Sequence, residues 1–543
     1  MPNGEKDSSL RPMMSERGWI LVWLVVTLAS LGLVPLFDLD EAIYAQTAWE
    51  MLQTHHWIVP QANGIHFFEK PPLVYYFMDL SFTLFGHNSF AARLPSLVFT
   101  LLTVAMLIHA GRRLISLRVG WLAALVFVSM LEVGLLAHAA ILDAALNFFV
   151  AATLLFWWLW LMQGKRVDLL LAAAMMGAAV SVKGPVGVVV PLAIVGLERL
   201  LSGHLLATLR RVEWLPVVGL FLLTATPWYV MIWWQNGSAF LWQFIMVQNI
   251  GRALHPMQGH GGGWYYYLLV LAVSVLPWLP LLPRLLSTVW QGNGYGDGFG
   301  DGRGELRPLL RFLFLWTVVT VMIFSLAQTK LPHYISSIYP ALALGLALVM
   351  RRAELSVAEV WVTLVVVLPV GLLVVALPWI WPQLTQMVHQ PRAVAVLSQP
   401  IVLGWHHTLA AVPLLLLLIW LVWRRQVLLL AGVGVALQGA LFFGVVPVVS
   451  ALMQGPQEAV AAAVRALPES TPVFSYNLNA PSISFAARRD YKIMLNGAGR
   501  EKIAITRRPY ALIMRSESRA QFPQLRTTSP LIDRGGYLLF VVQ

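Results

Sequence analysis

The feature that most constrains the fold of this chain is an apolar stretch of membrane-spanning length that recurs along the sequence. Crossing the hydrocarbon core of a bilayer takes roughly 20 mostly apolar residues in a helix. About thirteen such stretches lie at 18–37, 91–111, 119–138, 142–162, 168–182, 184–202, 213–234, 264–284, 309–328, 334–350, 357–379, 401–423 and 427–450. With 58% hydrophobic and 11% charged residues, a water-soluble globular domain is excluded. We therefore predict a mainly α-helical, multi-pass membrane protein.

Basic residues predict the orientation of these spans, because short cytoplasmic loops retain Lys and Arg. They recur in pairs between alternate stretches: Arg112 and Arg113, Lys165 and Arg166, Arg210 and Arg211, Arg351 and Arg352, and Arg424 and Arg425. With the N-terminus inside, segments 37–90, 233–263, 329–333 and 380–400 and the C-terminal tail are expected outside. The position of the basic residues at the membrane edges then explains the net charge of +12. We therefore expect no nucleic-acid partner. The first stretch is expected to remain a span, because Asp40 and Glu41 follow it in place of a cleavage site.

Two domains are expected. Residues 1–455 form the membrane domain, whose long outer segment 38–90 contains two predicted interfacial helices, at 41–53 and 71–85. Residues 456–543 form a small α/β cap, with predicted strands at 472–476, 510–514 and 537–542. The glycine-rich loop 291–306 is interpreted as a linker, since it does not join a strand to a helix as a phosphate-binding loop does.

Charged side chains at the membrane are the main functional signal. A charge at the bilayer centre costs roughly 2.5–3.5 kcal/mol on insertion scales, so such residues need a reason. Six of them lie at the predicted outer face: Asp40, Glu41, Glu69, Lys70, Asp143 and Lys183. Each alone could be an interfacial anchor or a helix cap. Their convergence on one face favours a common site.

The residue types in this set suit transfer chemistry at a membrane surface. A phosphate leaving group requires cations, which Lys70, Lys183 and Arg252 would supply. A carboxylate could bind a sugar or accept a proton from an acceptor.

Several motifs resemble one known family. They are Asp40-Glu41-x-x-Tyr44-Ala45, Trp57-Ile58-Val59-Pro60, Phe68-Glu69-Lys70-Pro71-Pro72, Ala91-Ala92-Arg93-Leu94-Pro95-Ser96, Ile141-Leu142-Asp143, Val182-Lys183-Gly184-Pro185, Gln248-Asn249-Ile250-Gly251-Arg252 and Lys330-Leu331-Pro332-His333-Tyr334. In this order they resemble the bacterial lipid A aminoarabinose transferases, relatives of the protein O-mannosyltransferase superfamily. The resemblance implies a C-type glycosyltransferase fold in the bacterial inner membrane, with its active site and C-terminal domain in the periplasm. It also implies a sugar donor linked to undecaprenyl phosphate and a lipid or glycolipid acceptor such as lipid A.

The resemblance also implies roles for individual residues. Asp40 would be the principal catalytic carboxylate and Asp143 a second acid, and Glu41 is a further catalytic candidate. Lys70, Lys183 and Arg252 would bind phosphate, and Tyr44 and Tyr334 would line the donor cavity. Glu69 with His260 would hold a divalent metal ion, Zn²⁺ or Mg²⁺/Mn²⁺. One departure is Ile43, where the aminoarabinose enzymes usually have arginine.

The expected reaction is an inverting displacement at the anomeric carbon, from which the polyprenyl phosphate leaves as an anion. Asp40 would orient a phosphate acceptor or act as general base toward a hydroxyl acceptor. The transferred sugar could be 4-amino-4-deoxy-L-arabinose. The acceptor could equally be another glycolipid, a protein hydroxyl or a cell-wall polymer. A transporter of lipid-linked sugar and an inactive scaffold are the alternatives outside the enzyme class.

Overall fold

The computed structural model describes residues 14–38, 40–255, 261–291, 306–350, 354–386, 405–504, 509–525 and 527–542. The metal-ligand candidate His260 and the glycine-rich loop, apart from Gln291 and Leu306, lie outside these residues.

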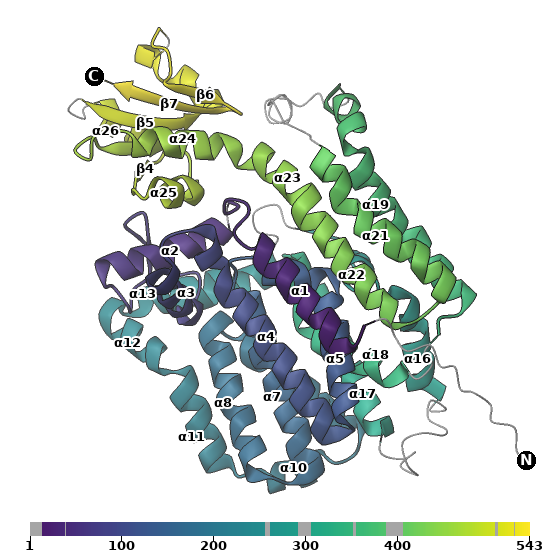
Figure 1. Cartoon of the computed structure of the whole chain (residues 1–543). Coiled ribbons are helices and arrows are strands. Elements are labelled where there is room, and N and C mark those ends of the chain that lie inside the picture. The colour runs from purple at the N-terminus through teal and green to yellow at the C-terminus, as the bar shows by residue number, and fades with distance from the viewer. Residues whose placement is uncertain are drawn as a thin grey trace, which may run out of the picture.

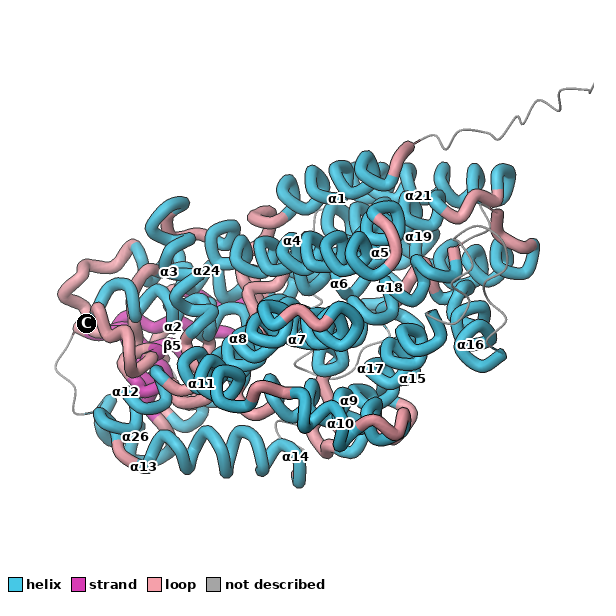
Figure 2. The backbone as a smooth tube through the Cα atoms, turned by 90° about the horizontal axis from the view of Figure 1, so that it is seen from below, coloured by secondary structure: helices cyan, strands magenta, loops and turns pink. Residues whose placement is uncertain are grey.

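The larger part of the molecule is a bundle of helices (Figures 1 and 2). Its first half contains α1 (Glu16–Ser30), α2 (Asp40–Thr54), α3 (Leu73–Phe85), α4 (Ser89–Leu114), α5 (Leu117–Ser129), α6 (Leu131–Ala137), α7 (Asp143–Gln163), α8 (Arg166–Lys183), α9 (Val186–Leu201), α10 (Leu205–Arg211), α11 (Trp214–Ala225), α12 (Pro227–Asn236) and α13 (Ser238–Leu241). A π-helix at Trp242–Gly251 leads into α14 (Arg252–Leu254), α15 (Tyr266–Ser274), α16 (Leu282–Gln291) and α17 (Leu306–Leu326). A 3₁₀-helix at Pro332–Ile338 precedes α18 (Tyr339–Val349), α19 (Val357–Gln386), α21 (Trp405–Arg424) and α22 (Leu428–Ala440), and a second π-helix at Leu441–Val445 precedes α23 (Val446–Met453).

Many of these helices have the length and surface of membrane spans. In the described part of the chain, six helices are long and apolar enough to cross a bilayer, and three bent helix pairs raise the number to nine. Large apolar side chains such as Leu215 on α11 and Val365 on α19 are exposed, as expected of a surface solvated by lipid. The prediction of a mainly helical, multi-pass membrane protein is therefore confirmed.

The outer segment between α1 and α4 contains both predicted helices, α2 and α3, and a short antiparallel hairpin of β1 (Gln61–Ala62) and β2 (Ile65–His66). The apolar face of α2, including Ala48 and Met51, is fully buried, and so is Tyr75 on α3. The apolar face of α2 therefore packs within protein, whereas α3 also has exposed apolar side chains, among them Leu80 and Leu84. That the two helices lie in the membrane interface stays a prediction. The additional cover comes from the C-terminal tail, which periodicity within α2 cannot reveal.

The tail is the predicted α/β unit. It contains α24 (Gly455–Arg465), β3 (Val473–Tyr476), α25 (Pro481–Ala487), β4 (Lys492–Met494), α26 (Asn496–Ala504), β5 (Tyr510–Arg515), β6 (Ile532–Arg534) and β7 (Tyr537–Val542). The strand order is β4-β3-β5-β7-β6, in which β3 pairs in parallel with both β4 and β5. The three predicted strands are present as β3, β5 and β7, whereas the short strands β4 and β6 were not predicted.

Polar contacts fix the tail to the outer segment, above which it lies in Figure 1. Both carboxylate oxygens of Asp38 accept hydrogen bonds from Ser482, from its backbone N–H at 2.9 Å and from its hydroxyl at 2.8 Å. Gln46 on α2 donates to Asp490 at 2.8 Å. These bonds place the loop after β3 beside the start of α2, where Asp40 lies.

Candidate active site

An apolar cavity of about 320 Å³ brings together the three cations predicted to bind phosphate. Lys70, Lys183 and Arg252 line it, together with Glu69 and Tyr334. The apolar part of its lining comes mainly from Leu146, Val186, Phe244, Ile323, Phe324 and Leu326. A cavity with this lining can accept an anionic group attached to an apolar chain.

Lys183 is oriented by Asp143. Its ammonium nitrogen lies 2.7 Å from Oδ1 of Asp143, and Nε2 of His333 lies 3.9 Å from the other carboxylate oxygen. Asp143 is only 3% exposed and does not line the apolar cavity, whereas Lys183 does. Asp143 therefore lies behind the lysine, in the geometry of a positioning residue.

Lys183 also lies over the ring of Tyr334, with its nitrogen 5.1 Å from the ring centroid. The backbone turns at Gly184, whose φ of +73° favours glycine. A Cβ at Gly184 would collide with the ring of Phe244, which lines the apolar cavity. Close approach of this turn to Phe244 thus requires glycine.

Arg252 is held by neighbours on three sides. Its guanidinium donates to Gln248 at 3.0 Å and to the Tyr334 hydroxyl at 3.2 Å, and it lies 3.8 Å from a carboxylate oxygen of Glu69. Its backbone carbonyl accepts from the N–H of Thr329 at 3.1 Å. Arg252 follows the ten-residue π-helix Trp242–Gly251, a rare conformation that is often found at functional sites.

Lys70 is almost completely buried. Burial lowers the pKa of its ammonium group to about 8, and the Arg252 guanidinium acts in the same direction. Lys70 therefore titrates near the physiological range, and an anion bound beside it would raise its pKa again.

A second, polar cavity of about 580 Å³ adjoins the first. Asp40 and Tyr44 line it, as do two residues of the tail, Asn479 and Ile493. Burial raises the pKa of the Tyr44 hydroxyl well above its ordinary value, and the nearby Asp40 carboxylate raises it further. Tyr44 therefore remains a hydrogen-bond donor at neutral pH.

Glu69 and Arg252 line both cavities. Their side chains thus form a wall between an apolar compartment that contains cations and a polar compartment that contains carboxylates. A molecule that spans this wall would place a phosphate on one side and its other substituent beside Asp40.

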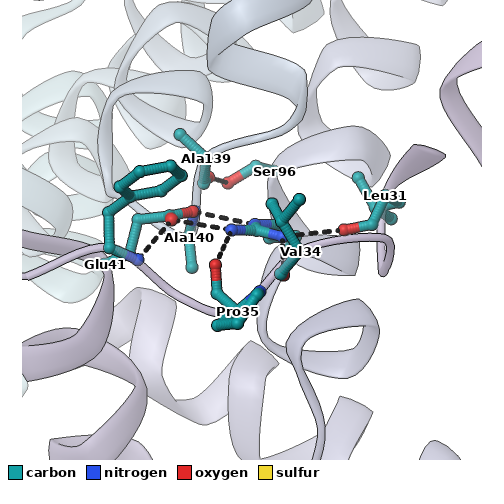
Figure 3. Close-up of polar contacts among 9 residues, drawn as sticks. Leu31, Val34, Pro35, Glu41, Ser96, Ala139 and Ala140 are labelled. Atoms are coloured by element: carbon teal, nitrogen blue, oxygen red, sulfur yellow. Dashed lines mark hydrogen bonds and ion pairs between the residues drawn. The ribbon is translucent and has the colours of Figure 1, made fainter. Parts of the chain in front are cut away.

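Glu41 lies apart from both cavities. It forms a buried ion pair with Arg93, with a shortest distance of 2.8 Å, and accepts hydrogen bonds from the backbone N–H groups of Ala140 at 2.7 Å and Phe37 at 3.1 Å (Figure 3). Arg93 in turn donates to the carbonyls of Leu31, Val34 and Pro35. Burial alone raises the pKa of Glu41, but Arg93 outweighs burial and holds it below its ordinary value. This geometry favours a structural role over the predicted catalytic one.

The described residues do not by themselves fit a metal site. They contain no group of three His, Asp or Glu side chains arranged to hold an ion. Glu69 lies beside Arg252, and its predicted partner His260 is outside the described residues.

Two residues around the site were not singled out from the sequence. Arg93 and His333 both lie in the quoted motifs, yet neither was assigned a role. The available signal for Arg93 was a charge inside the apolar stretch 91–111, which requires a partner.

Comparisons with known proteins define the class. The model of the dolichyl-phosphate-mannose-protein mannosyltransferase family matches residues 69–234. The whole chain superposes on the crystal structure of ArnT from Cupriavidus metallidurans bound to undecaprenyl phosphate, with a TM-score of 0.79, 20% identity and 96% of each chain covered. The chain therefore has the fold of a C-type membrane glycosyltransferase.

Similarity to individual proteins is more specific. The undecaprenyl phosphate-α-4-amino-4-deoxy-L-arabinose arabinosyl transferase of Serratia proteamaculans is 31% identical over 351 residues, which are 62% of this chain and 60% of that protein. The enzyme of the same name from Yersinia enterocolitica is 31% identical over 317 residues, 58% of this chain and 55% of that protein. The match thus spans about 60% or less of the length of these relatives. The resemblance predicted from the motifs is confirmed.

Proposed function

We propose that this chain is an integral membrane glycosyltransferase that moves a sugar from undecaprenyl phosphate to an acceptor at the outer face of the inner membrane. The observation that carries the proposal is the wall formed by Glu69 and Arg252 between the two cavities. The apolar cavity suits the polyprenyl phosphate, and the polar cavity suits the sugar and the acceptor. The names of the similar enzymes make 4-amino-4-deoxy-L-arabinose the first sugar to test, and lipid A is the first acceptor.

In the proposed reaction, an acceptor oxygen attacks the anomeric carbon as the bond from that carbon to the phosphate oxygen breaks. The leaving phosphate gains a negative charge, since a phosphodiester becomes a monoester. Lys70, Lys183 and Arg252 would stabilise this charge where it develops, in a site partly shielded from water. Asp143 would act indirectly, by holding Lys183 in position.

Asp40 is the proposed catalytic carboxylate. It lines the polar cavity near the wall, and burial does not shield it as it shields Asp143. With a hydroxyl acceptor, Asp40 would take the proton; with an ionised phosphate acceptor, it would orient the two reactants. Tyr44 and Tyr334 would contact substrate from the polar and the apolar cavity, respectively.

The proposed topology has thirteen spans, a cytoplasmic N-terminus and a periplasmic tail. Arg112 and Arg113 lie in the last turn of α4, and α10, which contains Arg210 and Arg211, lies at the end of the bundle away from the tail (Figure 1). This distribution supports the orientation, because basic residues favour the cytoplasmic side. The metal site at Glu69 and His260 stays a prediction, which can be tested by metal analysis of the purified protein.

The test of the proposed function is transfer of label. Detergent-purified protein is incubated with radiolabelled undecaprenyl-phosphate sugars and bacterial envelope extract, beside Asp40→Asn and the control Glu469→Gln, a variant of an exposed carboxylate on the tail. Transfer by the wild type and the control, but not by Asp40→Asn, is expected. Absence of transfer from every donor, with movement of sugar lipid across vesicle membranes instead, would support a transporter.

A further inference from the structure

The loop after β3 in the tail, Asn477 to Pro481, forms part of the polar cavity although it lies more than 400 residues from Asp40 in the sequence. Asn479 in this loop lines the cavity together with Asp40 and Tyr44. The loop follows the carboxyl end of β3, the strand with a parallel neighbour on each side. In open α/β sheets, ligands bind outside the carboxyl ends of the strands. The binding position lies where the connections from two neighbouring strands run in opposite directions.

The backbone of this loop is held on both sides of Asn479. The hydroxyl of Ser475 donates to the carbonyl of Leu478 at 2.8 Å, and the N–H of Ala480 donates to the Tyr491 hydroxyl at 2.8 Å. Two residues after Ala480, Ser482 is held by Asp38. The position of Asn479 is therefore fixed before any substrate arrives.

The loop is also fixed at its start. Asn477 adopts a left-handed conformation, with φ of 49°, and its side-chain oxygen accepts from the N–H of Asn496 at 2.8 Å. Its own N–H donates to the carbonyl of Met494 at 2.9 Å. The amide of Asn477 is thus used within the tail.

The amide of Asn479, by contrast, is exposed and has no hydrogen-bond partner within the described ranges of the chain. A carboxamide offers two donor hydrogens and an acceptor oxygen. Holding such a group rigid and unpaired at a cavity reduces the entropy lost when a ligand binds it.

The charges of the cavity indicate which ligand the amide would meet. Asp38, Asp40 and Glu69 contribute three carboxyl groups to the lining, and Arg252 contributes a guanidinium. Hydroxyl groups can donate to carboxylates and can both donate to and accept from an amide. Asn479 does not line the apolar cavity, so it lies on the side of the wall opposite the proposed polyprenyl phosphate.

We infer that Asn479 is a specificity-determining residue that binds the acceptor through sugar hydroxyl groups and makes the tail one half of the acceptor site. The inference rests on the proposed function for the direction of transfer. It goes beyond that function in assigning acceptor recognition to the tail.

The test measures binding separately from transfer. The probes are the β-1,6-linked glucosamine disaccharide with and without its phosphate groups, and their contact with the purified full-length protein is measured by saturation-transfer NMR. The variants are Asn479→Ala and Asn479→Asp, with Gln524→Ala as a control at an exposed amide elsewhere on the tail. The melting temperature of each variant checks that the tail remains folded.

Asn479→Ala should weaken binding of both disaccharides about tenfold, since the hydrogen bonds of the amide are lost. Asn479→Asp should keep binding of the phosphate-free disaccharide within about threefold, because a carboxylate still accepts from hydroxyl groups. The control should bind as the wild type does. In the transfer assay, Asn479→Ala should raise the KM for the acceptor and leave the KM for the donor unchanged.

Equal binding by the wild type and Asn479→Ala would overturn the inference, and so would absence of binding by the wild type. Loss of phosphate-free binding in Asn479→Asp would overturn recognition through hydroxyl groups. If the wild type binds the probes through Asn479 but transfers no label from any donor, the proposed function is wrong and the binding site stands.

Discussion

The ammonium nitrogen of Lys183, the last residue of α8, lies 2.7 Å from the carboxylate of Asp143, the first residue of α7. Two neighbouring helices thus meet at this ion pair, and the lysine extends from it into the apolar cavity. The buried carboxylate of Asp143 pairs with the lysine and orients it.

We expect Asp143→Asn to weaken binding of undecaprenyl phosphate about tenfold, because Lys183 loses its orienting partner. Lys183→Gln should have a similar effect, and the double variant should be little worse than either single variant, since residues in contact are energetically coupled. Isothermal titration of undecaprenyl phosphate into detergent-solubilised protein provides the measurement.

A matched control exists at the other end of the bundle, where Asp168 is equally buried and pairs with Arg113 at 2.6 Å. Asp168→Asn should leave the affinity for undecaprenyl phosphate unchanged. Additive effects of Asp143→Asn and Lys183→Gln would show that the two residues act independently.

The affinity for undecaprenyl phosphate should depend on pH through Lys70. The pKa of this lysine is about 8, below its ordinary value, so the positive charge is present below about pH 8 and is lost as the pH rises through that value. The dissociation constant for undecaprenyl phosphate should therefore increase above about pH 8, by at most tenfold per pH unit for one proton. Lys70→Arg should abolish this increase, because arginine remains charged. A wild-type profile that is flat between about pH 7 and pH 9.5 would contradict the role of Lys70.

Asp40 and Glu41 are adjacent in sequence, but we expect opposite phenotypes. Glu41→Gln removes one partner of a buried ion pair, a change that typically costs about 3–5 kcal/mol, so the melting temperature should fall clearly. Protein that remains folded should still transfer sugar. Asp40→Asn should abolish transfer and leave the melting temperature nearly unchanged, since Asp40 is exposed. Thermal unfolding and label transfer measured on the same samples distinguish the two roles.

The contact between α2 and the tail should weaken as the pH rises. Burial, together with the nearby Asp490 carboxylate, raises the pKa of Glu50 to about 7. Because the folded-state pKa exceeds the ordinary value of 4.5, this contribution to stability is complete below about pH 4.5 and is lost as the pH rises through about 7. Glu50→Gln should therefore raise the melting temperature by a few degrees at pH 8 and have little effect near pH 5. Hydrogen exchange in α2 should follow the same pattern, and a pH-independent effect of Glu50→Gln would contradict this account.

Much of the fold could be predicted from local patterns. The long apolar stretches appear as helices such as α4 and α7, and β3, β5 and β7 lie where short buried runs predicted strands. The strands β4 and β6 escaped prediction because each has only three residues and is partly polar. The burial of α2 escaped as well, since the side chains that cover it are far away in the sequence.

The candidate site shows the same limit. Charge and the family motifs identified Lys70, Lys183 and Arg252, and the structure brings all three to one cavity. The division into two compartments could not be predicted, because it depends on Glu69 and Arg252 meeting across the fold. Nor could Asn479, a single amide in a tail without charge patterning, be distinguished from any other surface residue.

The turn at Gly184 limits how this protein could adapt to lipids of different length. Lys183, which would bind the phosphate, is followed at once by Gly184, and the ring of Phe244 packs directly against this turn. The position of the phosphate-binding lysine and the position of the Phe244 ring in the cavity lining are therefore fixed by the same turn. A wider or deeper cavity for a longer isoprenoid would therefore require changes in other lining side chains, such as Ile323 on α17 or Leu146 on α7.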